Sequence, residues 1–385
     1  MESSLRIALL LNPFDLSVKG GEYAPQLALE LLGRGHTVRG FGAPPGVIPR
    51  SGTDPDNTGG AEARGVVAYG PDVILAYDAL SPAAFLGARA SRKLGVPLIL
   101  VEAGTRAAGL PHERFLRWLG EKLWGPFVRR HARLVIALDP VAELQALAEG
   151  FAGDRIRVLS QGVDLIRYRP GLSSSLLAAH RARGRVLLYV GLVSDNRGLD
   201  LVIQAFADSV GQSGDWSLVI AGGGPDAARR ALRAQVDRLG VGTGVHWLPL
   251  PREEELPGLL CSATLLLVPA VDSRVRGVQI PRALACGLPV LAADLPRLAH
   301  IHEDGGCGLL VKAGSAEAWT EAVRKAASSP EARKRWSQRA RELAKERFDW
   351  AMIAQTVEAW MDEVTKEPLV ASKPARVISP ETKAS

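Results

Sequence analysis

The chain has 385 residues, of which 47% are hydrophobic and 23% charged, as in a globular protein with room for two domains. Its formal net charge of +6 is compatible with phosphorylated ligands, a membrane surface or nucleic acid, and chooses none of them. No stretch of about 18 apolar residues is present, so we expect no membrane-spanning segment. Cys261, Cys286 and Cys307 lack metal-ligand spacing and have apolar or glycine-rich neighbours, which predicts buried thiols in a reducing cytosol.

The first half of the chain alternates short apolar runs with helical patterns. We expect strands at 5–11, 36–41, 72–76, 97–102, 134–138 and 156–159, and helices at 23–32, 80–94 and 140–148. Segment 42–60 is rich in Pro, Gly, Asp and Ser and is expected to form a mobile surface loop. Alternation of this kind predicts a parallel, doubly wound sheet.

Segment 113–133 has a different character. Phe115, Leu119 and Leu123 recur at helical spacing, and arginines and lysines surround them. Basic residues beside large apolar ones suit a helix that lies in an anionic lipid interface, here 113–130. A helix that faces the core and has a solvated basic side is the alternative. Pro126 is expected to break or kink the helix.

The second half repeats the alternation. Residues 187–190 form an apolar run that ends at Gly191, and Gly198 opens a segment whose apolar residues share one helical face. The next apolar run, 216–221, is stopped by three glycines. Such a βαβ unit puts its first loop at the carboxyl edge of a parallel sheet, where these sheets bind ligands. We expect strands near 185–190, 216–221, 244–248, 264–268, 289–292 and 308–311, and terminal helices at 316–327, 330–347 and 350–365.

Six short segments, in this order along the chain, resemble those of GT-B glycosyltransferases of the retaining family 4 type. They are Lys19-Gly20-Gly21-Glu22; Gly33 to Val38; Gln161-Gly162-Val163-Asp164 with Tyr168 and Pro170; Gly191 to Gly198; Ala221-Gly222-Gly223-Gly224-Pro225; and Ala285-Cys286-Gly287-Leu288-Pro289-Val290.

The resemblance implies an α/β protein of two Rossmann-like, doubly wound domains that face a cleft. The first, on the acceptor side, is expected at 1–160, and the second, on the nucleotide-sugar side, at 173–348. A hinge at 161–172 would join them, and a helix at 349–366 would cross back to the first domain. Residues 367–385 are polar, contain prolines and lack apolar periodicity, which predicts a disordered tail.

A nucleotide-sugar donor has a diphosphate leaving group, so its site needs backbone N–H groups, helix N-termini and cations. By the resemblance, Gly20, Gly21, Gly191 and Gly223 would let backbone approach the donor, and Arg197 would supply a cation. The alternatives are tight turns and a solvated loop arginine. The family's arginine directly after Gly191 is replaced by a leucine here.

The family's two donor-site glutamates, eight positions apart, align with Arg274 and Arg282, and a further glutamate aligns with His300. A guanidinium donates hydrogen bonds where a carboxylate accepts them, so these replacements reverse both the charge and the hydrogen-bonding role. An anion pocket would be formed by Arg197, Arg274, Arg276 and Arg282 together, or these would be surface arginines of a chain that has lost donor binding.

The catalytic residue is left open by the sequence. Some family members position the sugar with a histidine of the first domain, for which His112 is the nearest candidate. Asp78 and Glu102, which end predicted strands, are alternatives. No metal ligation pattern is found, and the resemblance implies front-face, retaining transfer without a metal.

The sequence therefore predicts a glycosyltransferase that moves a sugar from a nucleotide-diphosphate donor to a lipid-linked or saccharide acceptor, in cell-surface glycan or glycolipid synthesis. It would be cytoplasmic, peripheral on the inner face of the membrane through 113–130, and without a nucleic-acid partner. The alternative is a non-catalytic GT-B protein that binds a partner or an anionic ligand, which the arginines at 274 and 282 favour.

Overall fold

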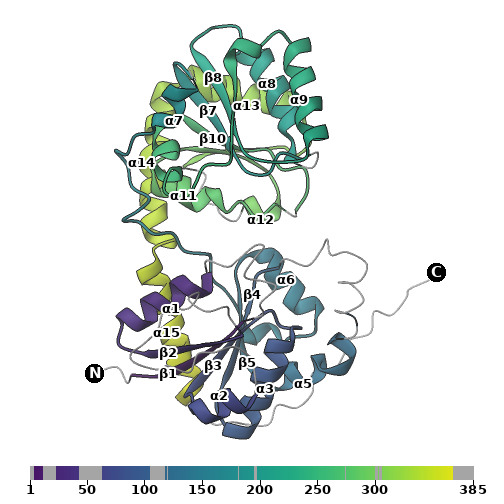
Figure 1. Ribbon diagram of the computed structural model, residues 1–385, viewed down its shortest axis with the longest axis vertical. Helices are drawn as coiled ribbons and strands as arrows, with labels where there is room; N and C mark the ends of the chain where they lie inside the picture. The colour runs from purple at the N-terminus through teal and green to yellow at the C-terminus, as the bar shows by residue number, and fades with distance from the viewer. Residues whose placement is uncertain are drawn as a thin grey trace, which may run out of the picture. The chain divides into compact units, whose positions relative to one another are not determined.

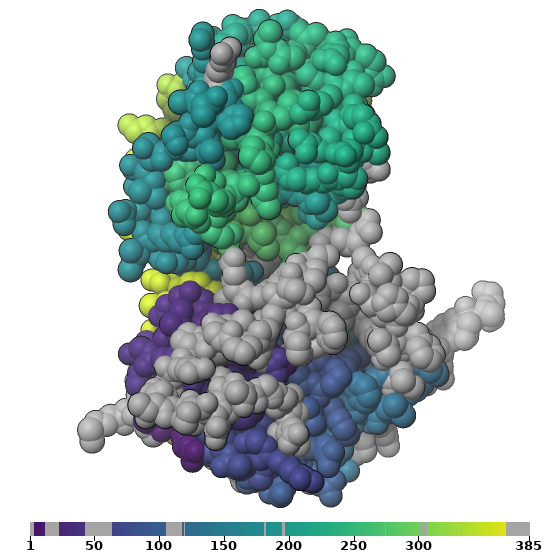
Figure 2. Space-filling model, in the orientation of Figure 1, coloured from purple at the N-terminus to yellow at the C-terminus, as the bar shows by residue number. Residues whose placement is uncertain are grey.

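A computed structural model describes residues 4–11, 23–42, 63–104, 118, 120–180, 182–194, 197–273, 275–299, 302 and 306–366. The chain divides into two compact units, Met1–Gln161 with Trp350–Ser385 and Gly162–Asp349 (Figure 1). Figure 2 shows one face of the protein in space-filling form, with the described residues in colour. The segment 42–60, apart from Gly42, and the tail 367–385 lie outside the described residues.

Unit 1 is built on a six-stranded sheet whose strand pairs are all parallel, in the order β2-β1-β3-β4-β5-β6. Its strands are β1 (Arg6–Leu10), β2 (Thr37–Phe41), β3 (Val73–Tyr77), β4 (Leu98–Glu102), β5 (Ala132–Ala137) and β6 (Ile156–Val158). Its helices include α1 (Tyr23–Gly33), α2 (Ala63–Tyr69), α3 (Pro82–Leu94), α5 (Gly125–His131), α6 (Pro140–Ala148) and α15 (Trp350–Lys366). The strands expected in this half are confirmed to within about two residues.

Both faces of this sheet are covered, because the inner strands β1, β3, β4 and β5 carry buried apolar side chains on both sides. Ile7 and Leu9 of β1 pack with α1 and α15 in one cluster of buried residues. Ala8 and Leu10, whose side chains point the other way, pack with α2, α3, α5 and α6 in a second cluster. This is the doubly wound arrangement that the alternation of strands and helices predicts.

The break expected at Pro126 is confirmed. The helical residues before it end at Leu123, Trp124 is in a turn, and α5 begins at Gly125 with the proline in its first turn. Proline fits there because the first N–H groups of a helix have no intrahelical partner. Of the expected interfacial helix 113–130, residues 113–117 and 119 lie outside the described part, and 118 and 120–130 lie within it.

Unit 2 has a second six-stranded parallel sheet, in the order β12-β11-β10-β7-β8-β9. Its strands are β7 (Arg185–Val190), β8 (Trp216–Ala221), β9 (Val245–Leu248), β10 (Leu265–Val268), β11 (Val290–Ala293) and β12 (Gly308–Val311). Its helices include α7 (Ser175–Ala179), α8 (Leu199–Ser209), α9 (Asp226–Arg238), α10 (Leu256–Ser262), α11 (Gln279–Ala285), α12 (Pro296–Ala299), α13 (Ala316–Ser328) and α14 (Pro330–Arg347).

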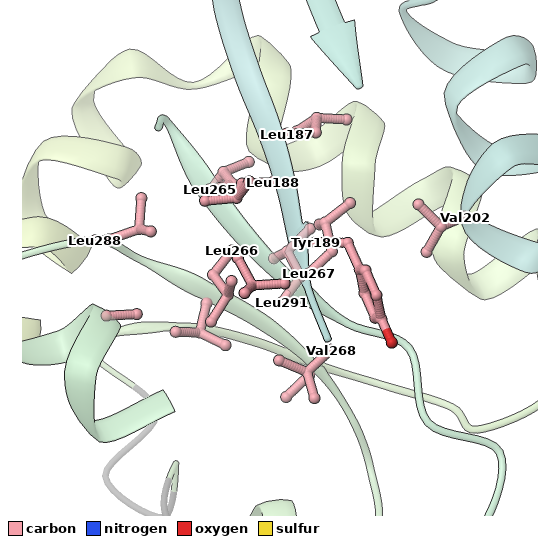
Figure 3. Packing of buried hydrophobic residues seen from close by; sticks show 14 of the residues in the cluster. Leu187, Leu188, Tyr189, Val202, Leu265, Leu266, Leu267, Val268, Leu288 and Leu291 are labelled. Carbon is pink, nitrogen blue, oxygen red and sulfur yellow. The ribbon is translucent and has the colours of Figure 1, made fainter. Parts of the chain in front are cut away.

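The core of unit 2 is one continuous cluster centred on β7 and β10. Leu187 and Leu188 of β7 lie beside Leu265 and Leu266 of β10 (Figure 3). Because the central strands of a parallel sheet are buried on both faces, they read as unbroken apolar runs in the sequence. All six strands expected in this half are confirmed, as are the three terminal helices.

The segment expected to be a hinge packs on unit 2. The N–H of Val163 donates to the carbonyl of Phe348 at 2.7 Å. The guanidinium of Arg341, on α14, donates to the carbonyls of Tyr168 at 3.0 Å and Ala285 at 2.6 Å. Tyr168 is buried.

The cysteine prediction is correct for two of the three thiols. Cys286 and Cys307 are buried, whereas Cys261 is partly exposed. The prediction fails at Cys261 because this residue lies in the last turn of the short helix α10, at the margin of the core, where its thiol contacts the carbonyl of Arg169. None of the described helices has the combination of length and apolarity needed to cross a membrane.

Candidate functional site

The loops that follow β7 and β8 lie side by side at the carboxyl edge of the unit 2 sheet. Their backbones continue to pair beyond the strands. The N–H of Gly191 donates to Ala221 at 3.0 Å, and the N–H of Val193 donates to Gly223 at 2.8 Å. The two loops therefore form one hydrogen-bonded surface at the edge of the sheet where parallel α/β proteins bind ligands. This surface, the ledge, consists of 191–194 with 197–198 and of 222–224.

The three consecutive glycines on this ledge have different roles. A Cβ at Gly222 would lie 1.8 Å from the carbonyl oxygen of Gly191, and one at Gly224 would lie 2.0 Å from that of Val193. These two glycines are needed because the neighbouring loop passes too close for a side chain. A Cβ at Gly223 would meet nothing within 4 Å. Gly223 is thus the glycine of the three with open space in front of it.

Arg197 lies at the end of the loop after β7. Its Nε is buried and has no hydrogen-bond partner in the described part of the chain. The adjacent Gly198 has φ +66°, and a Cβ there would lie 1.8 Å from the carbonyl oxygen of Pro269, so only glycine fits. Gly198 is also the N-cap of α8 and makes no side-chain cap. An arginine thus stands next to a helix N-terminus without a capping side chain, which is an arrangement suited to an anion.

Tyr189, near the end of β7, supports this loop. Its hydroxyl donates to the carbonyl of Leu192 at 2.7 Å. Burial raises the pKa of Tyr189 to about 12, although the positive charge of Arg197 acts in the opposite direction. Tyr189 is therefore a neutral donor that fixes the ledge. The sequence analysis missed it, because a tyrosine inside a strand reads as a core residue.

Arg282 belongs to a separate cluster. It lies on α11, where its guanidinium is 3.5 Å from a carboxylate oxygen of Glu253 and 5.4 Å from the centre of the Tyr168 ring. Glu253 also accepts from the Tyr168 hydroxyl at 3.3 Å and lies 3.6 Å from Arg167. Glu253 was not anticipated, since only the run of acidic residues at 253–255 marked it in the sequence.

In unit 1, Glu102 and Asp78 end neighbouring strands, as expected. Glu102 is 1% exposed, and its carboxylate accepts from the N–H of Ala79 at 3.3 Å and of Gly104 at 3.0 Å. It therefore ties together the loops that follow β3 and β4. Asp78 has φ +65°, a left-handed conformation that aspartate tolerates better than most residues, and its carboxylate accepts from the N–H of Leu80 at 3.4 Å.

The structure thus brings Gly191, Arg197 and Gly223 together on one ledge, and places Glu102 beside Asp78 in unit 1. The other expected site residues lie outside the described part of the chain: Gly20, Gly21, His112, Arg274 and His300. Among the described residues, no group of three or more His, Cys, Asp or Glu side chains is arranged to hold a metal ion.

Two family models match the chain. Residues 178–343 match the model for group 1 glycosyl transferases, and residues 19–162 match that for the glycosyl transferase 4-like domain. Among curated proteins, the chain is 30% identical over 293 residues to a D-inositol 3-phosphate glycosyltransferase of Saccharomonospora viridis, an alignment that covers 72% of this chain and 66% of the relative. A protein of the same name from Mycobacterium bovis is 31% identical over 235 residues, which cover 59% of this chain and 46% of that one. The chain therefore spans about half to two thirds of the length of these relatives.

Solved structures agree on the architecture. Anabaena HepE, crystallised with UDP, superposes with a TM-score of 0.74 at 19% identity, over 93% of this chain and all of HepE. A glycosyltransferase of Rickettsia africae gives a TM-score of 0.75 at 13% identity, over 94% of this chain and 99% of that one. At such identities the likeness establishes the two-sheet GT-B fold. With both family models matched in sequence order, the chain belongs to the group 1, 4-like family of glycosyltransferases.

Proposed function

We propose that this protein transfers a sugar from a nucleotide-diphosphate donor to a lipid-linked or saccharide acceptor, with retention at the anomeric carbon. The observation that carries the proposal is the ledge of unit 2, where the buried, unpartnered Nε of Arg197 adjoins the uncapped N-terminus of α8. The open face of Gly223 lies on the same ledge. A diphosphate carries the charge and the acceptor oxygens that such a site can satisfy.

The proposed chemistry follows from what the ledge offers. Breaking the bond between the sugar and the diphosphate builds negative charge on the leaving group, and fixed N–H donors and a guanidinium stabilise that charge. Arg197 would bind the diphosphate, and backbone at Gly191 and Gly223 would lie against the donor. HepE has been crystallised with UDP and with UDP-glucose, which supports uridine nucleotides as the first donors to test.

On the acceptor side, the relatives' names point to a small phosphorylated polyol, D-inositol 3-phosphate, as one acceptor to test. A membrane-bound acceptor is supported by the described part of 113–130. Trp118 is 55% exposed and Leu123 is 65% exposed, and the intervening Lys122 is exposed too. Apolar and basic side chains exposed together suit the surface of an anionic bilayer. Glu102 would act here as a positioning residue that holds the loops after β3 and β4.

The test is a thermal-shift panel of UDP, GDP and ADP, followed by UDP-glucose and related donors. Wild-type protein should be stabilised by at least one of these, and Arg197→Ala should lose most of that shift. The matched control is Arg324→Ala, which removes an exposed arginine paired with Glu321 on α13 and should leave the shift unchanged. No stabilisation of the wild type by any nucleotide diphosphate would overturn the proposal.

A non-catalytic protein that binds an anionic ligand is the second candidate, and the environment of Arg282 favours it. Where the family has a glutamate, this chain has an arginine that pairs with Glu253 and stacks on Tyr168. Release of free UDP from the stabilising donor, in the presence of candidate acceptors, separates the two functions. Binding in the thermal-shift panel without any turnover across acceptors would favour the non-catalytic protein.

A further inference from the structure

Two of the three cysteines are in contact in unit 2. Cys261 lies in the last turn of α10 and Cys286 caps the end of α11. The thiol of Cys286 hydrogen-bonds the sulfur of Cys261. The two residues are separated by a whole strand and helix in the sequence, so this contact is a product of the fold. Neither the sequence motifs nor the proposed transfer reaction gives the pair a role.

The surroundings make the two thiols unequal. The hydrogen bond from Cys286, the N–H of Leu172 and the charge of Arg341 together lower the pKa of Cys261 to about 7, against the effect of partial burial. Cys286 is the donor in this hydrogen bond, which raises the pKa of Cys286, and burial raises it further. At neutral pH, Cys261 is therefore the more readily ionised of the two thiols, and Cys286 keeps its proton.

Of the two thiols, Cys261 is the one that is partly exposed to solvent. A hollow of about 660 Å³ is lined by the segment Gly171–Leu176 and by Glu254, Glu255, Pro257 and Gly258 of the α10 region. Two of the residues that line the hollow contact the thiols. The backbone N–H of Leu172 donates to the sulfur of Cys261, and the carbonyl oxygen of Pro257 lies 3.9 Å from the sulfur of Cys286. Cys261 itself is partly exposed, and as a neutral thiol it donates to the carbonyl of Arg169 at 3.0 Å.

We propose that Cys261 and Cys286 form an oxidisable dithiol site, in which Cys261 is the attacking and Cys286 the resolving thiol, and that a peroxide converts them to an internal disulfide. The pair stands next to an opening that admits a small solute. The partner thiol already hydrogen-bonds the sulfur of Cys261, so the second step joins two neighbouring sulfur atoms.

The reaction balances as two steps. The Cys261 thiolate attacks one oxygen of hydrogen peroxide, the O–O bond breaks, and hydroxide leaves and takes up a proton as water, giving the sulfenic acid of Cys261. The Cys286 sulfur then attacks the Cys261 sulfur, the S–O bond breaks, and the departing hydroxide takes the Cys286 proton and leaves as water. The two thiols lose two electrons, the peroxide gains them, and one S–S bond results.

The disulfide would tie the end of α10 to the end of α11 within unit 2. This proposal is independent of the proposed transferase activity, because it rests on the contact of the thiols and on the partial exposure of Cys261. Its test therefore reads the thiols themselves and needs neither donor nor acceptor.

The experiment treats the full-length protein with a small excess of hydrogen peroxide at neutral pH, then blocks remaining thiols with an alkylating reagent. Wild-type protein should retain one free thiol of three, lose the mass of two hydrogens before alkylation, and yield a peptide pair joined through Cys261 and Cys286. Dithiothreitol should restore all three thiols.

Cys307→Ser is the matched control, because it removes the other buried thiol and should leave the joined peptides unchanged. Cys286→Ser should instead accumulate a sulfenic acid on Cys261 that a dimedone probe traps. Cys286→Ala, checked by circular dichroism, covers the case in which the serine variant does not fold. Wild-type protein that stays reduced, forms only intermolecular disulfides, or stops at an oxyacid of Cys261 would overturn the proposal.

Discussion

At the scale of single residues, the glycines after β8 show how much the candidate site depends on close backbone packing. Gly222 and Gly224 face the carbonyls of the neighbouring loop at distances no side chain tolerates, whereas Gly223 faces open space. The three glycines cannot be told apart in the sequence, yet close packing requires two of them and leaves open space at the third. Substitutions at the adjacent positions Gly222 and Gly223 should therefore have different effects on stability.

Gly222→Ala should destabilise the protein by about 2 kcal/mol or more, because the new methyl group forces the 191 loop away. Gly223→Ala should leave the free energy of unfolding within about 0.5 kcal/mol of wild type, as expected for an unobstructed site. It should nevertheless weaken the nucleotide-induced thermal shift. Urea unfolding of both variants measures the difference, and equal stabilities would contradict the roles assigned to these glycines.

The positions of Gly191, Arg197 and Gly223 near strand ends could be predicted from the sequence, whereas the partners of Arg282 could not. Gly191, Arg197 and Gly223 follow from short motifs, since each lies within a few residues of a strand end. The ion pair of Arg282 with Glu253 joins α11 to the loop after β9 and exists only in the folded unit. The same holds for the contact of Cys261 with Cys286. Pairings of this kind depend on tertiary structure, and periodicity carries no information about them.

At the scale of elements, strands were predictable because buried parallel strands are continuous apolar runs bounded by glycine, proline or polar residues. The short helix α2 was not predicted, since its seven residues are too few to show a helical period. The segment 118–130 shows the opposite case, in which one proline correctly marks where a helix begins.

The exposed apolar side chains of this segment give a prediction for the proposed membrane surface. Leu123→Glu should reduce binding to vesicles containing anionic lipid by about tenfold or more, because it removes an apolar contact and adds charge repulsion. Leu144→Glu is the matched control, as Leu144 on α6 is 61% exposed against 65% for Leu123. Co-sedimentation at two salt concentrations measures both. Equal binding by the two variants would show that the segment is an ordinary solvated surface that does not contact the membrane.

At the scale of the whole molecule, the last described helix completes the first unit. Trp350, Ile353, Val357 and Met361 of α15 are buried in the same cluster as β1 and α1. Glu358 of α15 accepts hydrogen bonds from Arg34 and from Nε2 of His36, whose Nδ1 accepts from the N–H of Leu5. The chain thus returns to its beginning to cover one face of the first sheet.

A chain that stops after Asp349 should lose the order of unit 1 while unit 2 remains folded, because the missing helix leaves a large apolar face uncovered. A chain that stops after Lys366 should behave as the full-length protein. Limited proteolysis followed by mass spectrometry distinguishes them, since the shorter chain should yield a protected fragment near Gly162–Asp349. Equal protection of unit 1 in both chains would show that α15 is dispensable.

The two-unit α/β fold and the family could thus be predicted from the sequence, because they depend on periodicity and on motifs spread along the whole chain. The reacting residues were not, since the family's carboxylate positions carry arginines at 274 and 282. An arginine in place of a glutamate removes the motif from which a role in donor binding is inferred. The partners of such an arginine are set by the folded structure and cannot be inferred from the sequence.

In the proposed function, the loops after β7 and β8 hold a nucleotide diphosphate. Hydrogen–deuterium exchange with and without UDP tests it most directly, because it reports which backbone amides the ligand protects. Bound UDP should slow exchange at 191–194, at 197–201 and at 222–224, and Arg197→Ala should show none of this slowing. Protection confined to other segments, under conditions where UDP is bound, would contradict it.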